Sequence, residues 1–121
     1  MNSTLGRHFA EALAVKDAER IEELLDPQVD FRGLTPNRAW EASGAGDVTA
    51  LLFRDWFEES DHLDQLVEVE TAEMADRERV AYRLRGHNAD GDFLVEQLAY
   101  YAEQDGRIVW MRVLCSGFRP G

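Results

Sequence analysis

The sequence predicts an α+β fold, a cone in which three to four N-terminal helices are wrapped by a curved antiparallel sheet. Two observations predict it. Apolar residues recur at helical spacing through most of the first half, whereas from Leu63 onward they alternate with polar residues as in strands. Turn-forming residues then divide the second half into four segments. The 121 residues suffice for one core with a modest cavity, so we expect a single domain over residues 1–121.

Two helices and a short strand are predicted at the N-terminal end. The apolar spacing from Leu5 to Leu13 predicts an amphipathic first helix. Asp17 is positioned to cap a second helix, and Pro27 ends it because proline cannot continue a helix. Residues 28–32 then form a short strand.

Two further helices are predicted before the sheet. Pro36 stands where proline is favoured at the start of a helix, which predicts a short helix over residues 37–42 that carries Trp40. Asp47 caps a longer helix. Its broad apolar face, which includes Trp56, is typical of a helix packed on a sheet.

Four strands are predicted for the second half, joined by polar turns into an antiparallel meander. Each strand alternates apolar and polar residues, so one face of the sheet is expected to be buried. The strands comprise residues 66–74, 79–87, 93–103 and 107–118.

Composition excludes several classes of partner. The chain has 13 Lys and Arg against 24 Asp and Glu, a formal net charge of −11 at pH 7. Such a surface repels phosphate backbones and anionic lipid, so we expect neither nucleic acid nor membrane as a partner. Without an apolar run of the ~20 residues that cross a bilayer, and without a secretion signal, a cytoplasmic location is expected.

Neither a metal nor a cofactor is expected. The single Cys115 and the three scattered histidines match no zinc spacing, and one cysteine forms no internal disulfide. On its apolar strand, Cys115 is predicted to be a buried small hydrophobe rather than a nucleophile.

Three local patterns carry a resemblance to a known superfamily. They are Phe-Ala-Glu-Ala-Leu at residues 9–13 running into Lys16-Asp17, Leu-Asp-Pro-Gln-Val-Asp-Phe at residues 25–31, and Asp-Gly-Arg-Ile-Val at residues 105–109. In their order and spacing the chain resembles, over nearly its whole length, the nuclear transport factor 2-like superfamily. That superfamily includes ketosteroid isomerases, limonene epoxide hydrolase and SnoaL-like polyketide cyclases. The resemblance implies a fold but no single reaction, because the superfamily is catalytically diverse.

The same resemblance implies that one known mechanism is missing. Ketosteroid isomerases use a Tyr, an Asp general base and a second acid, and aligning the three patterns puts Phe9, Phe31 and Leu98 at those positions. None of these transfers a proton or holds an oxyanion, so isomerisation by that route is not expected. Residues 108–118 also contain no Asp, Glu or His in place of the acid groups of epoxide hydrolases and cyclases.

Glu96 and Tyr100 are the candidate catalytic residues. Alternation places both on one face of the third predicted strand, and the alignment with the superfamily implies that this face looks into the cone. Burial would raise the pKa of Glu96 toward the range of a general base, with Tyr100 as a polarising hydrogen-bond donor. The alternative is that Glu96 pairs with Arg83 or Arg85 on the adjacent strand, or lies on the outer face.

Aromatic and apolar side chains are numerous enough to line a flat pocket for a small planar molecule. The alternative for each of them is a place in the core, although we expect Trp40 or Trp56 to touch any cavity. The candidate binding residues are Phe9, Phe31, Trp40, Trp56, Tyr82, Leu98, Met111 and Val113.

The opposite face of the last two strands is predicted to pair two copies of the chain. It would leave Tyr101, Trp110, Arg112 and Leu114 together in water as a largely apolar patch. Members of the superfamily commonly pair through this sheet surface, so we expect a homodimer with Trp110 central to the interface.

Two functional hypotheses follow. The first is a small-molecule-binding SnoaL-like protein with an apolar pocket, which as an enzyme would act as a cofactor-free acid–base cyclase, dehydratase or isomerase. The second is a non-catalytic dimeric module that binds a protein partner. The state of the cavity discriminates them, because chemistry needs a desolvated space and a scaffold does not.

Overall fold

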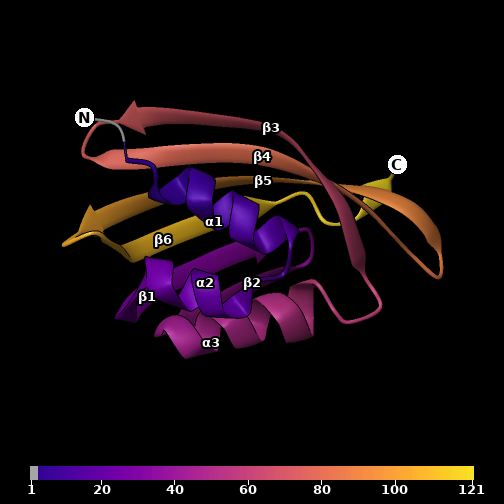
Figure 1. Ribbon diagram of the computed structural model, residues 1–121, viewed down its shortest axis with the longest axis horizontal. Coiled ribbons are helices and arrows are strands. Elements are labelled where there is room, and N and C mark those ends of the chain that lie inside the picture. Colours follow the sequence, from indigo (N-terminus) through magenta and orange to yellow (C-terminus); the bar gives the residue numbers. More distant parts are fainter. Residues whose placement is uncertain (1–2) are drawn as a thin grey trace.

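The computed structural model describes residues 3–121 and shows a curved sheet with helices packed on one of its faces (Figure 1). This is the cone-like α+β arrangement that the sequence predicts. Among the described residues, no helix combines the length and hydropathy that crossing a bilayer requires. The elements in chain order are α1 (Leu5–Ala14), α2 (Ala18–Leu24), β1 (Leu25–Thr35), β2 (Arg38–Ser43), α3 (Ala45–Ala50), the π-helical η1 (Leu51–Trp56), β3 (His62–Met74), β4 (Arg77–Asn88), β5 (Gly91–Gln104), β6 (Arg107–Cys115) and β7 (Arg119–Pro120).

The strands of residues 3–121 join in one sheet. Its order is β2-β1-β6-β5-β4-β3, and the short β7 pairs with β5. The pairings are antiparallel except that of β1 with β6, which is parallel. The predicted meander of four strands is therefore present, and β1 attaches the N-terminal half to it. Helix α1 packs on β3, β4 and β5, α2 on β1 and β6, and α3 on β1 and β2.

The predicted helix over residues 37–42 is wrong, because this segment is the strand β2. Thr35 and Arg38 are paired across the chain reversal, so Pro36 and Asn37 form a two-residue hairpin loop. Proline with its fixed φ suits the second position of a turn as well as the first position of a helix. Pairing with β1 decides between the two, and local sequence does not contain that partner.

Of α1, α2 and α3, only α2 begins with a side-chain cap, and the sequence predicts this cap. The Asp17 side chain accepts a hydrogen bond from the backbone N–H of Arg20 at 3.0 Å, so α2 begins where predicted. Helix α3 begins at Ala45, earlier than the expected cap at Asp47. It continues into the wider turns of η1, where the Phe57 N–H donates to the Leu52 carbonyl at 2.7 Å.

The core lies between the helices and the inward face of the sheet. Tyr101 shows how closely α1 approaches, because its hydroxyl accepts a hydrogen bond from the Gly6 N–H at 2.9 Å. A Cβ added to Gly6 would lie 2.7 Å from the Tyr101 ring, so only glycine allows this approach. The predicted place of Tyr101 on an outer pairing face is therefore wrong. The buried inward residues of the sheet include Val29, Phe31, Val80, Tyr82, Leu84, Val95, Ala99, Tyr101, Met111 and Val113.

Candidate functional site

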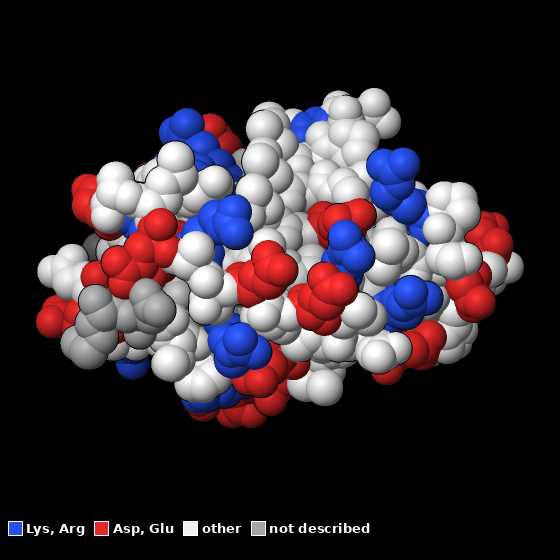
Figure 2. Space-filling view, turned by 90° about the horizontal axis from the view of Figure 1, so that it is seen from above, with Lys and Arg blue, Asp and Glu red and all other residues white. Residues whose placement is uncertain are grey.

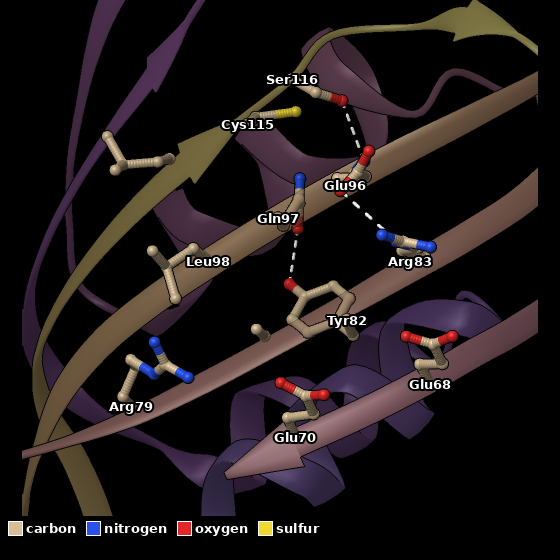
Figure 3. Close-up of a pocket in the computed structure, with 12 residues that line it drawn as sticks. Glu68, Glu70, Arg79, Tyr82, Arg83, Glu96, Gln97, Leu98, Cys115 and Ser116 are labelled. Atoms are coloured by element: carbon tan, nitrogen blue, oxygen red, sulfur yellow. Dashed lines mark hydrogen bonds and ion pairs between the residues drawn. The ribbon is translucent and has the colours of Figure 1, made fainter. Parts of the chain in front are cut away.

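Glu96 lies on the outer face of the sheet, and its predicted inward orientation is wrong. The Arg83 Nε lies 3.4 Å from a Glu96 carboxylate oxygen, and both side chains are about half exposed (Figure 3). Register explains this arrangement. Directly paired residues share a face, so the inward Tyr82 of β4 places its partner Gln97 inward and Glu96 outward. The alternative prediction, an ion pair with Arg83 on the adjacent strand, is confirmed.

Tyr100 and Leu98 share the outer face with Glu96. Tyr100 is paired with Arg79 on one side and Arg112 on the other, and both it and Leu98 are partly exposed. Their predicted positions in an interior site are therefore wrong. A carboxylate in water beside an arginine is not desolvated, so the burial that would turn Glu96 into an interior base is absent.

The predicted binding residues of the interior are part of the closed core. Each is at most 3% exposed, and they pack in one continuous apolar cluster with the helices. The cone is filled by these side chains where the sequence predicts a pocket. The residues concerned are Phe9, Phe31, Tyr82, Met111 and Val113.

An aromatic cluster joins β1, β2 and η1. The rings of Phe31 and Trp56 have centroids 6.0 Å apart, and the Trp40 and Trp56 rings meet edge to face at 6.3 Å. Gly33 makes room for this packing, because an added Cβ would lie 2.5 Å from the Trp56 ring. Trp40 is only partly buried, and its indole N–H donates to the Thr35 hydroxyl at 2.9 Å. The cluster brings together three of the predicted binding residues.

Trp56 differs from Trp40 in that its indole N–H has no hydrogen-bond partner among the described residues. The side chain is buried, and it stands on the last residue of the π-helical segment η1. A buried N–H without a partner costs about 1–3 kcal/mol, and π-helical turns recur at functional sites. An acceptor that reached the Trp56 N–H would therefore stabilise this position.

A surface depression of about 400 Å³ is lined in part by Trp56. Its rim is acidic, and the buried carboxylate of Asp61 belongs to it. Asp61 accepts hydrogen bonds from the Glu58 N–H at 3.0 Å and the Asn88 side-chain amide at 2.9 Å, so both of its oxygens are engaged in holding two loops together. The lining comprises Trp56, Glu58, Ser60, Asp61, Asn88, Ala89, Asp90 and Phe118.

A second buried polar group was not identified by sequence reasoning. The Tyr82 hydroxyl donates to the Gln97 side-chain oxygen at 2.5 Å, whereas the Gln97 amide nitrogen has no partner within the described part of the chain. Burial, with a smaller contribution from Cys115, raises the pKa of Tyr82 far above its usual value, so the phenol stays protonated. The core position of Tyr82 was predictable, and register then places Gln97 beside it.

The outer face carries an open groove of about 510 Å³ over β3 to β6 (Figure 3). Ala81, Leu98 and Leu114 form an apolar row across three strands, since they are directly paired. Charged residues of both signs flank this row. In the view of Figure 2, Lys and Arg are likewise interspersed with Asp and Glu. The lining comprises Glu68, Glu70, Arg79, Ala81, Tyr82, Arg83, Glu96, Gln97, Leu98, Leu114, Cys115 and Ser116.

The described residues include no group of three or more His, Cys, Asp or Glu side chains that could hold a metal ion. His62 and His87 do stack at 4.9 Å, and His87 Nδ1 lies 2.7 Å from an Asp64 carboxylate oxygen, all on the surface.

No protein-family model matches the chain, and no curated protein matches it by sequence. Solved structures match it well. A candidate isomerase from Bacillus subtilis is 19% identical with a TM-score of 0.75, over 91% of this chain and 82% of that one. A hypothetical protein from Catenulispora acidiphila DSM 44928 with a ketosteroid isomerase-like fold, in complex with trimethylamine, is 13% identical with a TM-score of 0.73, over 96% and 88%. A candidate polyketide cyclase from Xanthomonas campestris pv. campestris is 19% identical with a TM-score of 0.71, over 91% and 86%.

These likenesses show the fold. The chain has the nuclear transport factor 2-like, SnoaL-like fold that the sequence patterns indicate. Proteins named as isomerases and cyclases share this fold, which is compatible with many reactions.

Proposed function

We propose that this chain binds a small, planar, largely apolar molecule at the cluster of Phe31, Trp40 and Trp56, and that the molecule carries a hydrogen-bond acceptor. The observation that carries the proposal is the buried N–H without a partner on Trp56, a side chain that belongs both to the cluster and to the lining of the surface depression. A ligand carbonyl or ether oxygen would accept this hydrogen bond.

The chemistry around Trp56 selects the ligand further. Flat aromatic rings offer contact area to a planar molecule. The depression is lined by Glu58, Asp61 and Asp90, and the chain as a whole carries a net charge of −11, so an anionic ligand is repelled. A neutral ketone or a related oxygen compound fits both features.

Binding is supported more strongly than acid–base catalysis. Within residues 3–121, the buried side chains with polar groups include Thr49, Asp61 and Gln97 and the phenols of Tyr82 and Tyr101, whose pKa values are raised by burial. Thr49 and Gln97 do not exchange protons near neutral pH, and both Asp61 oxygens already accept hydrogen bonds. Glu96 lies on the outer face. We therefore do not assign the isomerase and cyclase activities named for proteins of this fold to Thr49, Asp61, Gln97 or Glu96.

The test uses 1-tetralone and tetralin, which have nearly the same shape and differ in one carbonyl oxygen. Indole N–H signals in ¹H–¹⁵N spectra report each tryptophan separately. We expect 1-tetralone to move the Trp56 signal farther than tetralin does, because only the ketone accepts a hydrogen bond from the indole N–H. Trp56→Phe keeps a ring and removes the donor, and loss of one neutral hydrogen bond should weaken binding of the ketone about tenfold without affecting tetralin.

Trp110→Phe is the matched control. Trp110 lies on the outer face, and the guanidinium groups of Arg77 and Arg112 lie over its ring at 4.5 Å and 4.4 Å from the centroid. This variant should bind 1-tetralone like wild type. The proposal is refuted if both compounds shift the Trp56 signal equally, or if Trp56→Phe binds the ketone unchanged.

A second candidate function, self-association through the outer sheet face, is favoured by its apolar row. Leu34 and Leu114 are directly paired and are 51% and 48% exposed, and Leu98 continues the row. The row is flanked by the ion pairs Arg83–Glu96 and Arg32–Glu41, so the face presents both charges. A two-fold dimer needs such a self-complementary surface, and we infer that a second copy of this chain covers it.

Leu114→Glu should convert the dimer to a monomer, because two carboxylates would be buried near the symmetry axis. Sedimentation equilibrium measures the change. Val15→Glu is the matched control, since Val15 is exposed at the end of α1, which packs on the face of the sheet opposite to Leu114. A wild-type protein that stays monomeric at tens of micromolar excludes this interface.

A further inference from the structure

Cys115 occupies an unusual position for a cysteine expected to be a simple core residue. It ends β6 directly opposite the inward-facing Gln97, is partly exposed, and borders the groove together with Gln97. Its sulfur accepts a hydrogen bond from the Gly117 N–H at 3.4 Å. The residue is partly exposed, so the sulfur is not sealed in the core.

The unpartnered amide of Gln97 is the second, independent observation. Gln97 is 3% exposed, and its side-chain nitrogen points toward Cys115 (Figure 3). The Tyr82 hydroxyl donates to the Gln97 oxygen and thereby determines which end of the amide faces the sulfur. Because Tyr82 stays protonated, it keeps that orientation over the physiological pH range. The Gln97 side-chain N–H is therefore directed toward a thiol sulfur, which is only a weak hydrogen-bond acceptor.

We propose that Cys115 is a site of reversible oxidation by hydrogen peroxide, and that the Gln97 amide nitrogen binds the oxygen of the resulting sulfenic acid. The Cys115 thiolate attacks one peroxide oxygen, so an S–O bond forms as the O–O bond breaks. The departing hydroxide takes up the proton that the thiol released and becomes water. Sulfur is oxidised, peroxide is reduced, and thiol plus hydrogen peroxide gives sulfenic acid plus water.

The composition of the chain sets the fate of this sulfenic acid. Cys115 is the single cysteine, so an internal disulfide is not available. The sulfenic acid persists until a small thiol attacks the sulfur, which forms a mixed disulfide and releases the oxygen as water; a second thiol then restores Cys115. This oxidation chemistry does not involve the proposed ligand site at Trp56.

Dimedone trapping and intact-protein mass spectrometry after a peroxide pulse measure the lifetime of the sulfenic acid. Gln97→Met removes the N–H and retains a side chain of similar length, and we expect the lifetime to fall about tenfold for the loss of a hydrogen bond to a polar oxygen. Cys115→Ser should give no adduct. The alkylation rate with iodoacetamide reports access to the sulfur, and it should be the same in wild type and Gln97→Met.

Tyr82→Phe is the second variant, used because Gln97→Met leaves the Tyr82 hydroxyl without its acceptor and can reduce stability. Tyr82→Phe retains Gln97 and removes the hydrogen bond that orients its amide. The lifetime of the sulfenic acid should therefore lie between those of wild type and Gln97→Met. Two results overturn the proposal: wild type that is alkylated by iodoacetamide and yields no dimedone adduct after peroxide, or a folded Gln97→Met protein whose sulfenic acid lasts as long as that of wild type.

Discussion

Replacing Phe31 by alanine is expected to destabilise the protein by about 3–5 kcal/mol, because a large aromatic side chain is removed from the closed core. Phe31 is 1% exposed, and its ring packs against that of Trp56. Urea unfolding followed by circular dichroism measures the change in the free energy of unfolding. The variant should also lose binding of 1-tetralone, since the cavity it leaves removes one wall of the aromatic cluster.

Phe118→Ala is the matched control for this prediction. Phe118 stacks on Phe57 and Phe93 with centroids 5.9 Å and 4.3 Å away, but it is 42% exposed. Less apolar area is lost and no closed cavity forms, so the cost should be about 1–2 kcal/mol. Equal costs for the two substitutions would show that Phe31 is not enclosed as the structure has it.

Gly86→Ala is expected to cost about 3 kcal/mol or more, although it adds a single methyl group. The new Cβ would lie 2.2 Å from the backbone carbonyl oxygen of His62 and 2.6 Å from the Phe93 ring. Backbone cannot move aside as a flexible side chain does, so β3 and β4 would have to separate locally. Thermal unfolding should show a midpoint lowered by roughly 10 °C for a chain of this size.

Gly46→Ala is the same substitution with the opposite expected sign. Gly46 lies in α3, and an added Cβ would meet nothing within 4 Å. Alanine in a helix is about 0.5–1 kcal/mol more favourable than glycine, so this variant should be slightly more stable than wild type. If both variants lose stability equally, the close approach of β3 to Gly86 is not present in solution.

The contrast between β2 and the meander shows which kind of prediction holds. The strands of the second half were predictable because alternation over nine or more residues, with polar turns between, is a strong local signal. The segment 37–42 has no such signal, and Pro36 is compatible with a turn or a helix start. Its strand conformation depends on β1, whose own extent of Leu25–Thr35 exceeds the five residues predicted.

Glu96 shows a different kind of error. Both faces of β5 contain apolar residues, because Leu94, Leu98 and Tyr100 alternate with Val95, Ala99 and Tyr101. Period-two alternation says that two faces exist and does not say which is buried. Pairing with the inward Tyr82 and Leu84 of β4 decides it. The observed register places the candidate base Glu96 outside and the amide of Gln97 inside, the reverse of the prediction.

The sequence by itself determined the fold class, the meander and the charge. Helical and strand periodicities are written in neighbouring residues, and net charge is a sum over the chain. Tertiary structure alone decided the face of each strand, the filling of the cone and which buried N–H groups of the described residues, those of Trp56, Arg79 and Gln97, have no partner. These depend on which atoms meet across distances of many residues, where a register difference of one position exchanges the inner and outer sets.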